Sequence, residues 1–329
     1  MLFSSFNIWE DGEYSFPHCF GFVPNIHSYL HNDGKKRPAI LIVPGGGYGY
    51  CSEQEGEPVA AVFFEMGYQA FVLTYTTNLL FLDPLLDQPL KDITRAVRIL
   101  RSRHEEFQLI PDQIAVCGFS AGGHLTASLG VFHPELPEDE KYPGISARPD
   151  AMLLCYPVIT MGTFAHKGSV TALLGDHPSK ELKDHYSLEK QVGPATPPAF
   201  IFQTAGDGSV PVENSGMFAN AMKKAGVPFA YHVFTTGPHG LSIATEDWVN
   251  RVHCNIYTLD QVCRMLDQFQ KGQLPEADPE YARAMVEKFE PRRNPGYINT
   301  DKQPNHEVAV WPVLADQWLR YVRGVTPCL

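Results

Sequence analysis

The segment CGFSAGG, residues 117–123, stands between an apolar run at 114–116 and a run of helix formers at 125–129. It places Ser120 in G-x-S-x-G spacing, in the strand-turn-helix context that a nucleophilic serine requires. The chain turns so sharply there that the flanking positions have no room for side chains, which is why both are glycine. The segment therefore predicts Ser120 as a nucleophile, with an inert serine in a glycine-rich turn as the alternative.

Apolar runs and amphipathic segments alternate on both sides of this turn. We expect strands at 39–43, 69–75, 113–118, 151–156, 199–204 and 229–234, and helices at 58–66, 90–107, 122–131, 212–225 and 308–322. Strands that alternate with helices predict an α/β fold whose central sheet is mostly parallel and is covered by helices on both faces.

Two stretches rich in proline and charge interrupt this alternation, near 134–149 and 249–306. We interpret both as surface insertions in one domain that spans 1–329. For the second insertion, a lid, a subunit contact and a plain surface elaboration all remain open.

Composition excludes several classes of function. The 329 residues are 44% hydrophobic and 19% charged, with a formal net charge of -11 that disfavours nucleic acid as a partner. No apolar run reaches membrane-spanning length, the first residues lack a basic, apolar leader pattern, and the seven cysteines form no CxxC pair. We expect a cytoplasmic protein with free thiols, no membrane partner and no metal, because no His, Cys, Asp or Glu group has metal-ligand spacing.

A second glycine-rich segment, VPGGGYGY at 43–50, follows the apolar run 39–43. Such a loop brings backbone N–H groups close to negative charge, as a dinucleotide, a nucleotide phosphate or an acyl-transfer oxyanion would need. The dinucleotide fingerprint fails because Tyr50 occupies its third glycine position, and no Gly-Lys-Ser/Thr of a P-loop follows. The oxyanion is the remaining interpretation.

A nucleophilic serine needs a base, and the base needs an orienting carboxylate. Asp207 follows the apolar run 199–204 and His239 lies in the loop after 229–234, so we predict them as acid and base. His232 lies within a predicted strand and His124 in the first turn of a predicted helix, so both are better explained as structural. Glu213 fits a first-turn helix residue better than an alternative acid.

Four segments, taken together and in this order, resemble the esterases of the acetyl-xylan-esterase and BD-FAE group, which are α/β-hydrolases related to hormone-sensitive-lipase-like enzymes. The segments are RPAILIVPGGGYGYCSEQEGEPVAAVFFEMGYQAFVLTY (37–75), VCGFSAGGHLTASLG (116–130), TAGDGSVPVENS (204–215) and GPHGLS (237–242). The resemblance implies the same triad of Ser120, Asp207 and His239. It further implies that the oxyanion hole is formed by the backbone N–H groups of Gly46, Gly47 and Ala121.

Together these patterns predict a serine carboxylesterase that acts on small acyl esters, acetyl in particular, plausibly on a carbohydrate. The expected partner is a small-molecule ester, no cofactor is needed, and a homo-oligomer is left open. Tyr48 and Tyr50 beside the glycine loop, and Phe81 in an apolar loop, are candidates for substrate contacts. A peptidase of the prolyl-oligopeptidase type and a binding protein that retains the fold are the alternatives; the first generally carries a propeller domain that this length does not accommodate.

Overall fold

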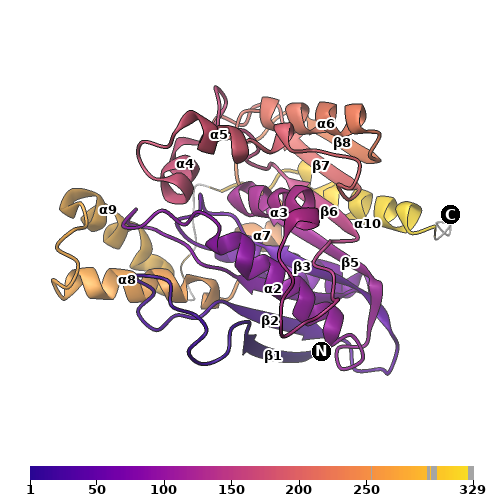
Figure 1. The fold of residues 1–329 in the computed structure, drawn as a ribbon, viewed down its shortest axis with the longest axis horizontal. Helices are drawn as coiled ribbons and strands as arrows, with labels where there is room; N and C mark the ends of the chain where they lie inside the picture. The colour runs from indigo at the N-terminus through magenta and orange to yellow at the C-terminus, as the bar shows by residue number, and fades with distance from the viewer. Residues whose placement is uncertain (253, 295–296, 298–301, 325–329) are drawn as a thin grey trace.

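The chain folds around a mixed β-sheet in the computed structural model, which describes residues 1–252, 254–294, 297 and 302–324 (Figure 1). The strands of these residues are β1 (Leu2–Asn7), β2 (Asn25–Leu30), β3 (Arg37–Val43), β4 (Gln69–Thr74), β5 (Leu109–Phe119), β6 (Ala151–Cys155), β7 (Ala199–Thr204) and β8 (Phe229–Phe234). Their order across the sheet is β1-β2-β4-β3-β5-β6-β7-β8. β2 is antiparallel to both of its neighbours, whereas every pairing from β4 to β8 is parallel.

Helices cover both faces of this sheet. They are α1 (Glu57–Glu65), α2 (Gln88–Ser102), α3 (Ser120–Phe132), α4 (Lys167–Leu174), α5 (Lys180–His185), α6 (Glu213–Ala225), α7 (Glu246–Val249), α8 (Asp260–Gln270), α9 (Pro279–Phe289) and α10 (Trp311–Val322). α2, α3 and α6 pack on one face, while α1, α7 and α10 pack on the other. Within the described ranges, no helix is both long enough and apolar enough to pass through a membrane.

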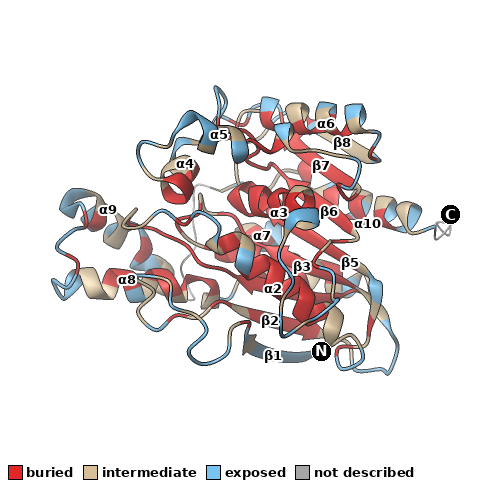
Figure 2. Ribbon diagram, in the orientation of Figure 1, coloured by how far each residue is buried: buried red, intermediate tan, exposed pale blue. Residues whose placement is uncertain are grey.

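β3 illustrates why the central strands are continuously apolar. Leu41 and Val43 point to the face of α2 and α3, whereas Ile40 and Ile42 point to the face of α1 and α10. All four side chains are fully buried, as the red strands in the middle of the sheet indicate (Figure 2). A strand buried on both faces has no polar positions, because neither face meets water.

The predicted α/β architecture is confirmed, and several boundaries need correction. The helix expected over 90–107 ends at Ser102, after which residues 103–108 form turns that lead into β5. The strand expected at 113–118 begins earlier, at Leu109. β1 and β2 were not predicted, because β1 is almost wholly exposed and has no buried face to mark it. α4 and α5 were also missed; both are short.

In the stretch 249–306, the described residues include the α-helices α8 and α9, which lie beside the sheet rather than on it. α8 and α9 form the edge of the molecule at the left of Figure 1. They share a small apolar cluster with the loop that carries Leu79 and Leu80, to which Met265 and Phe289 belong. Part of the insertion, residues 253, 295–296 and 298–301, lies outside the described residues. What is described is a helical unit whose apolar cluster is completed by residues from outside the insertion.

The other insertion, 134–149, is irregular and is held down by arginines of α2. Arg98 donates hydrogen bonds to the carbonyls of Pro137 and Ile145, and Arg95 forms an ion pair with Asp139. Backbone carbonyls in a loop without regular structure need such partners. Most of its residues are exposed or partly exposed.

A matched pair of helical glycines tests the packing of α3 against the sheet. A Cβ on Gly122 would overlap the backbone oxygens of Val43 and Pro44, whereas one on Gly216 of α6 would meet only Tyr231 Oη at 3.9 Å. We expect Gly122→Ala to lower the free energy of unfolding by about 2 kcal/mol or more. Gly216→Ala should raise it by about 0.5–1 kcal/mol, because alanine favours a helix. Urea denaturation measures both, and equal effects would contradict the packing argument.

His124 is a buried core residue, as its position in the first turn of α3 suggested. Its Nδ1 lies 2.8 Å from the hydroxyl of Tyr48 and its Nε2 lies 2.9 Å from the carbonyl oxygen of Tyr186. The carbonyl can only accept, so Nε2 carries the proton and Nδ1 accepts from the tyrosine. Burial lowers the pKa of His124 to about 4, so the folded protein keeps this imidazole neutral.

This buried histidine should make stability depend on pH. In the unfolded chain an imidazole takes up a proton near pH 6.5, so between there and about pH 4 the unfolded state binds more protons and stability falls as the pH falls. We expect His124→Gln to reduce the loss of unfolding free energy between pH 7 and pH 5 by about 2 kcal/mol. Urea denaturation at both pH values measures it, and an equal loss in wild type and variant would contradict the assignment.

Candidate functional site

Ser120 lies at the tight turn between β5 and α3. Its backbone is in the left-handed region, with φ of 52°, and the residue is 5% exposed. A Cβ on Gly118 would overlap the carbonyl oxygen of Gly122, just as one on Gly122 would overlap the end of β3. The two glycines therefore allow the turn, and the turn holds a non-glycine residue in a strained conformation of a kind that recurs at functional sites.

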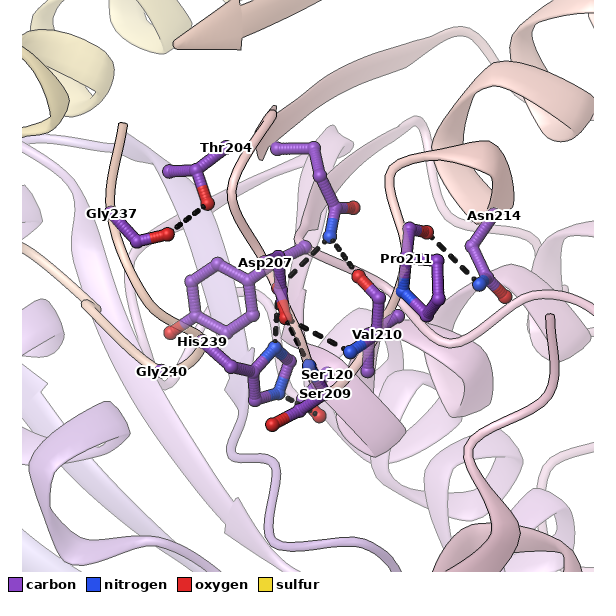
Figure 3. Close-up of polar contacts among 12 residues, drawn as sticks. Ser120, Thr204, Asp207, Ser209, Val210, Pro211, Asn214, Gly237, His239 and Gly240 are labelled. Atoms are coloured by element: carbon purple, nitrogen blue, oxygen red, sulfur yellow. Dashed lines mark hydrogen bonds and ion pairs between the residues drawn. The ribbon is translucent and has the colours of Figure 1, made fainter. Parts of the chain in front are cut away.

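His239 and Asp207 lie in a row with Ser120 (Figure 3). The Oγ of Ser120 is 2.7 Å from His239 Nε2, and His239 Nδ1 is 2.6 Å from Asp207 Oδ2. The three residues follow β5, β8 and β7, whose carboxyl ends meet at one edge of the sheet. This geometry allows an imidazole to accept the serine proton while a carboxylate fixes its tautomer.

Asp207 is buried, and the protein supplies donors to both of its oxygens. Oδ1 accepts from the backbone N–H of Ser209 and Val210, while Oδ2 accepts from Gln203 Nε2 as well as facing His239. A buried carboxylate is tolerated when its lone pairs are satisfied in this way. These bonds also fix the direction in which the carboxylate faces the imidazole.

The glycine loop after β3 borders the same site. Gly46 and Gly47 have φ of 122° and 66°, and both line the cavity that holds Ser120 and His239. A Cβ on Gly46 would overlap the carbonyl oxygen of Tyr50, so the loop can take this path only with glycine there. Ala121 is buried directly after Ser120, at the start of α3. Of the three residues expected to form an oxyanion hole, Gly46 and Gly47 thus line the same cavity as Ser120, and Ala121 follows Ser120 in the chain.

Glu55 anchors this loop, and the sequence offered no signal for it. Its Oε2 accepts the N–H of Gly45 at 2.8 Å, and its Oε1 accepts the hydroxyl of Tyr156 at 2.7 Å. The ring of Tyr156 lies edge to face with His239, with centroids 5.0 Å apart. Glu55 is 5% exposed, so one buried carboxylate connects the glycine loop to the residue that braces the histidine.

A cavity of about 420 Å³ opens beside Ser120 and His239. Tyr50 and Phe81, two of the candidates for substrate contacts, line it. Tyr50 packs edge to face on Phe289, and Phe81 lies 5.2 Å from the ring of Tyr281. These contacts hold both rings against α9, so two walls of the cavity depend on the second insertion.

Tyr48 does not line the cavity, and the expectation that it contacts substrate is wrong. Its side chain is 1% exposed and its hydroxyl binds His124 in the core. The residue has φ of 62°, a backbone conformation that residue spacing does not reveal and that accompanies a side chain turned into the core. Phe119 and His232 are also away from the cavity lining.

Other cavity residues escaped the sequence analysis. His166 caps α4, where its Nδ1 accepts the N–H of Ser169, so the neutral ring carries its proton on Nε2. Burial lowers the pKa of His166, and the nearby His239 adds to the effect. Met285, Lys288 and Lys302 reach the cavity from the second insertion. Each is an isolated residue in an irregular or charged stretch, so no motif marks it.

Over the part of the chain that the structure describes, no group of three or more His, Cys, Asp or Glu side chains is placed to hold a metal ion. The polar groups around Ser120 are instead engaged with one another, as the bonds of Asp207 and Glu55 illustrate.

Two curated relatives align with a large part of the chain. The endo-1,4-beta-xylanase B of Butyrivibrio fibrisolvens is 44% identical over 259 residues, which are 78% of this chain and 41% of that protein. The acetylxylan esterase of Xylanibacter ruminicola is 32% identical over 215 residues, 63% of this chain and 42% of the relative. The chain therefore spans about two fifths of the length of these relatives.

Solved structures share the fold. An acetyl ester-xyloside bifunctional hydrolase from Caldicellulosiruptor lactoaceticus superposes with a TM-score of 0.68 at 37% identity, covering 82% of this chain and 97% of the other. The sugar hydrolase YeeB from Lactococcus lactis gives a TM-score of 0.67 at 26% identity, covering 98% and 100%. These similarities confirm the α/β-hydrolase fold.

The family model described as BD-FAE matches residues 27–222, more than half of the chain. That range includes the glycine loop and the turn at Ser120. The resemblance seen in the sequence is thereby confirmed: the chain belongs to the BD-FAE family.

Proposed function

We propose that the protein is a serine carboxylesterase that removes small acyl groups, acetyl in particular, from carbohydrate esters. The observation that carries the proposal is the row Ser120, His239 and Asp207, with separations of 2.7 and 2.6 Å, beside an open cavity. Ester hydrolysis needs an activated nucleophile, a proton carrier and room for the acyl group, and this arrangement supplies the three together.

In the first step, Ser120 Oγ forms a bond to the acyl carbon while its proton passes to His239 Nε2. The tetrahedral intermediate then breaks its bond to the alcohol oxygen, which takes the proton from His239. Water repeats the sequence on the acyl-enzyme, releasing the acid and restoring Ser120. Asp207 stabilises the imidazolium that forms in each half-reaction, and its backbone donors keep the carboxylate oriented towards the ring.

We assign stabilisation of the oxyanion in both tetrahedral intermediates to the backbone N–H groups of Gly46, Gly47 and Ala121. Their positions at the cavity and directly after Ser120 support this assignment. Removing one donor of this kind typically costs on the order of 3 kcal/mol of transition-state stabilisation. Glu55 contributes indirectly, because its bond to Gly45 N holds the loop in place.

Two observations support a carbohydrate as the alcohol half of the ester: the names of the relatives and the lining of the cavity. One relative is named as an acetylxylan esterase and one structure as an acetyl ester-xyloside hydrolase. The cavity is lined by polar groups such as Ser52, Glu55 and Lys302 as well as by rings, which suits a sugar better than an alkyl chain. The xylanase name is not carried over, because this chain corresponds to 41% of that relative.

The nucleophile can be tested with p-nitrophenyl acetate. We expect Ser120→Ala to lower kcat by at least about 10³-fold, since the base then has no hydroxyl to activate. The variant should also fail to react with a fluorophosphonate probe that labels the wild type. Ser5→Ala, which removes an exposed hydroxyl from β1, serves as the matched control. Unchanged turnover in Ser120→Ala would refute the mechanism.

Acyl size can be tested with p-nitrophenyl esters of increasing chain length. Tyr50 and Phe81 are braced against Phe289 and Tyr281, so the cavity cannot widen without moving α9. Because each methylene changes discrimination by about 1–3 kcal/mol at most, the preference should be steep but not absolute. We expect kcat/KM for acetate and propionate to exceed that for octanoate by at least about tenfold. A steady rise from acetate to octanoate would contradict the small-acyl assignment.

A further inference from the structure

Cationic side chains gather where the second insertion meets the cavity. Within the described ranges, this cluster holds four cations and two carboxylates, which are Arg251, Lys288, Arg292, Lys302, Glu53 and Glu55. The cluster therefore carries an excess of two positive charges, although the whole chain has a formal net charge of -11. A local field of this sign in a cavity attracts anions.

The two arginines of this cluster form ion pairs with a glutamate of the same chain. Arg292 donates from Nη2 and Nε to the two oxygens of Glu53, and Arg251 Nη1 lies 3.0 Å from Glu53 Oε1. Burial alone would raise the pKa of Glu53, but the adjacent guanidinium groups hold that pKa below its usual range. These ion pairs tie the insertion to the segment after the glycine loop, so we assign them a structural role.

The two lysines instead contact a backbone carbonyl and aromatic rings. Lys302 Nζ donates to the carbonyl oxygen of Gly240 and lies 4.5 Å from the ring centre of Trp248. Lys288 Nζ lies over the rings of Tyr50 and Phe289, at 5.6 and 5.5 Å. Considering only residues that the structure describes, no carboxylate lies within 4.0 Å of either ammonium group.

Glu55 lines the cavity, and both of its carboxylate oxygens accept hydrogen bonds from other groups. They accept the N–H of Gly45 and the hydroxyl of Tyr156. Burial lowers the pKa of Lys302, because partial removal of an ammonium group from water disfavours its charged form. An anion in the cavity would offset that destabilisation.

The position of Lys302 indicates which half of the ester would carry the anion. Its partner Gly240 directly follows His239, the residue that would return the proton to the leaving alcohol. Lys302 is therefore anchored to the loop of His239, which favours contact with the alcohol half of the ester over the acyl half. Lys288 borders the same cavity from α9.

We propose that the alcohol half of the substrate carries a carboxylate that binds Lys288 and Lys302, so that the preferred substrates are esters of acidic sugars such as uronic acids. The inference rests on the proposed esterase function and deepens it. Charge-assisted hydrogen bonds to two ammonium groups would provide affinity and would orient the sugar relative to Ser120. The neutral cavity residues would contact the rest of the ring.

Two probes that differ in one group test the proposal. One is the acetylated methyl glycoside of glucuronic acid, and the other is the same compound with its carboxylate converted to the primary amide. We expect kcat/KM to be at least about tenfold higher for the acid. This ratio should fall towards one in Lys288→Met and Lys302→Met, and should recover in part in Lys302→Arg. It should also fall as sodium chloride is raised to about 0.5 M, because salt screens the attraction.

The ratio separates a charge effect from general damage, since both probes share the ester and the ring. Lys224→Met, which removes the same charge from the exposed side of α6, is the control and should leave the ratio unchanged. Equal rates for the two probes in the wild type, or a ratio that both lysine variants preserve, would overturn the inference while leaving the esterase proposal intact. If neither probe nor p-nitrophenyl acetate is hydrolysed, the esterase proposal itself fails. A preference for an acid placed in the acyl half, as in a succinyl ester, would overturn the assignment to the alcohol half.

Discussion

The close approach of α3 to the end of β3 is the constraint on which the site depends. Gly122 has backbone oxygens of β3 and of the following residue where a side chain would stand, so the first turn of the helix can lie against the strand end. That contact brings Ser120, which is the first residue of α3, beside the loop that begins at Pro44. A larger residue at Gly122 would separate the proposed nucleophile from the glycine loop by moving the helix. The glycines of the two segments thus form one structural requirement, although they are far apart in the chain.

Buried carboxylates give this arrangement its rigidity. Asp207, Glu55 and Glu53 are each almost completely removed from water, and each has several donors that the fold supplies. An ionised carboxylate carries a large desolvation penalty, so losing one donor leaves the charge poorly compensated. The three therefore act as fixed points: Asp207 orients the histidine, Glu55 holds the glycine loop, and Glu53 holds the insertion. Hydrogen bonds and ion pairs to these carboxylates therefore position the site as much as apolar packing does.

The parts that sequence could predict are those encoded in local pattern. Apolar runs marked the buried strands, and the spacing around Ser120 marked a turn that leaves few alternatives. The prediction that Tyr48 contacts substrate was wrong because neighbouring side chains along a chain can point in opposite directions. The positive φ of Tyr48 accompanies a side chain that points into the core. Glu55 and Lys302 meet at the site from distant segments of the chain, and each was one charged residue among many. Their contacts depend on how the insertion folds, which no periodicity in a proline-rich stretch reveals.

Two separate parts of the chain form the cavity, and this division has a consequence for specificity. Ser120, His239 and Asp207 follow the strand ends. Tyr281 and Lys288 instead stand on α9, whose buried Ala282 and Phe289 belong to the cluster shared with α8. Packing in that cluster is distinct from packing on the two faces of the sheet. Substitutions on the cavity side of α9 can therefore reshape the cavity while the strand ends keep their geometry. The insertion thus forms part of the cavity wall, and it is joined to the rest of the chain by the Glu53 ion pairs, by the hydrogen bonds between Gln261 and Thr77 and by the loop at Leu79.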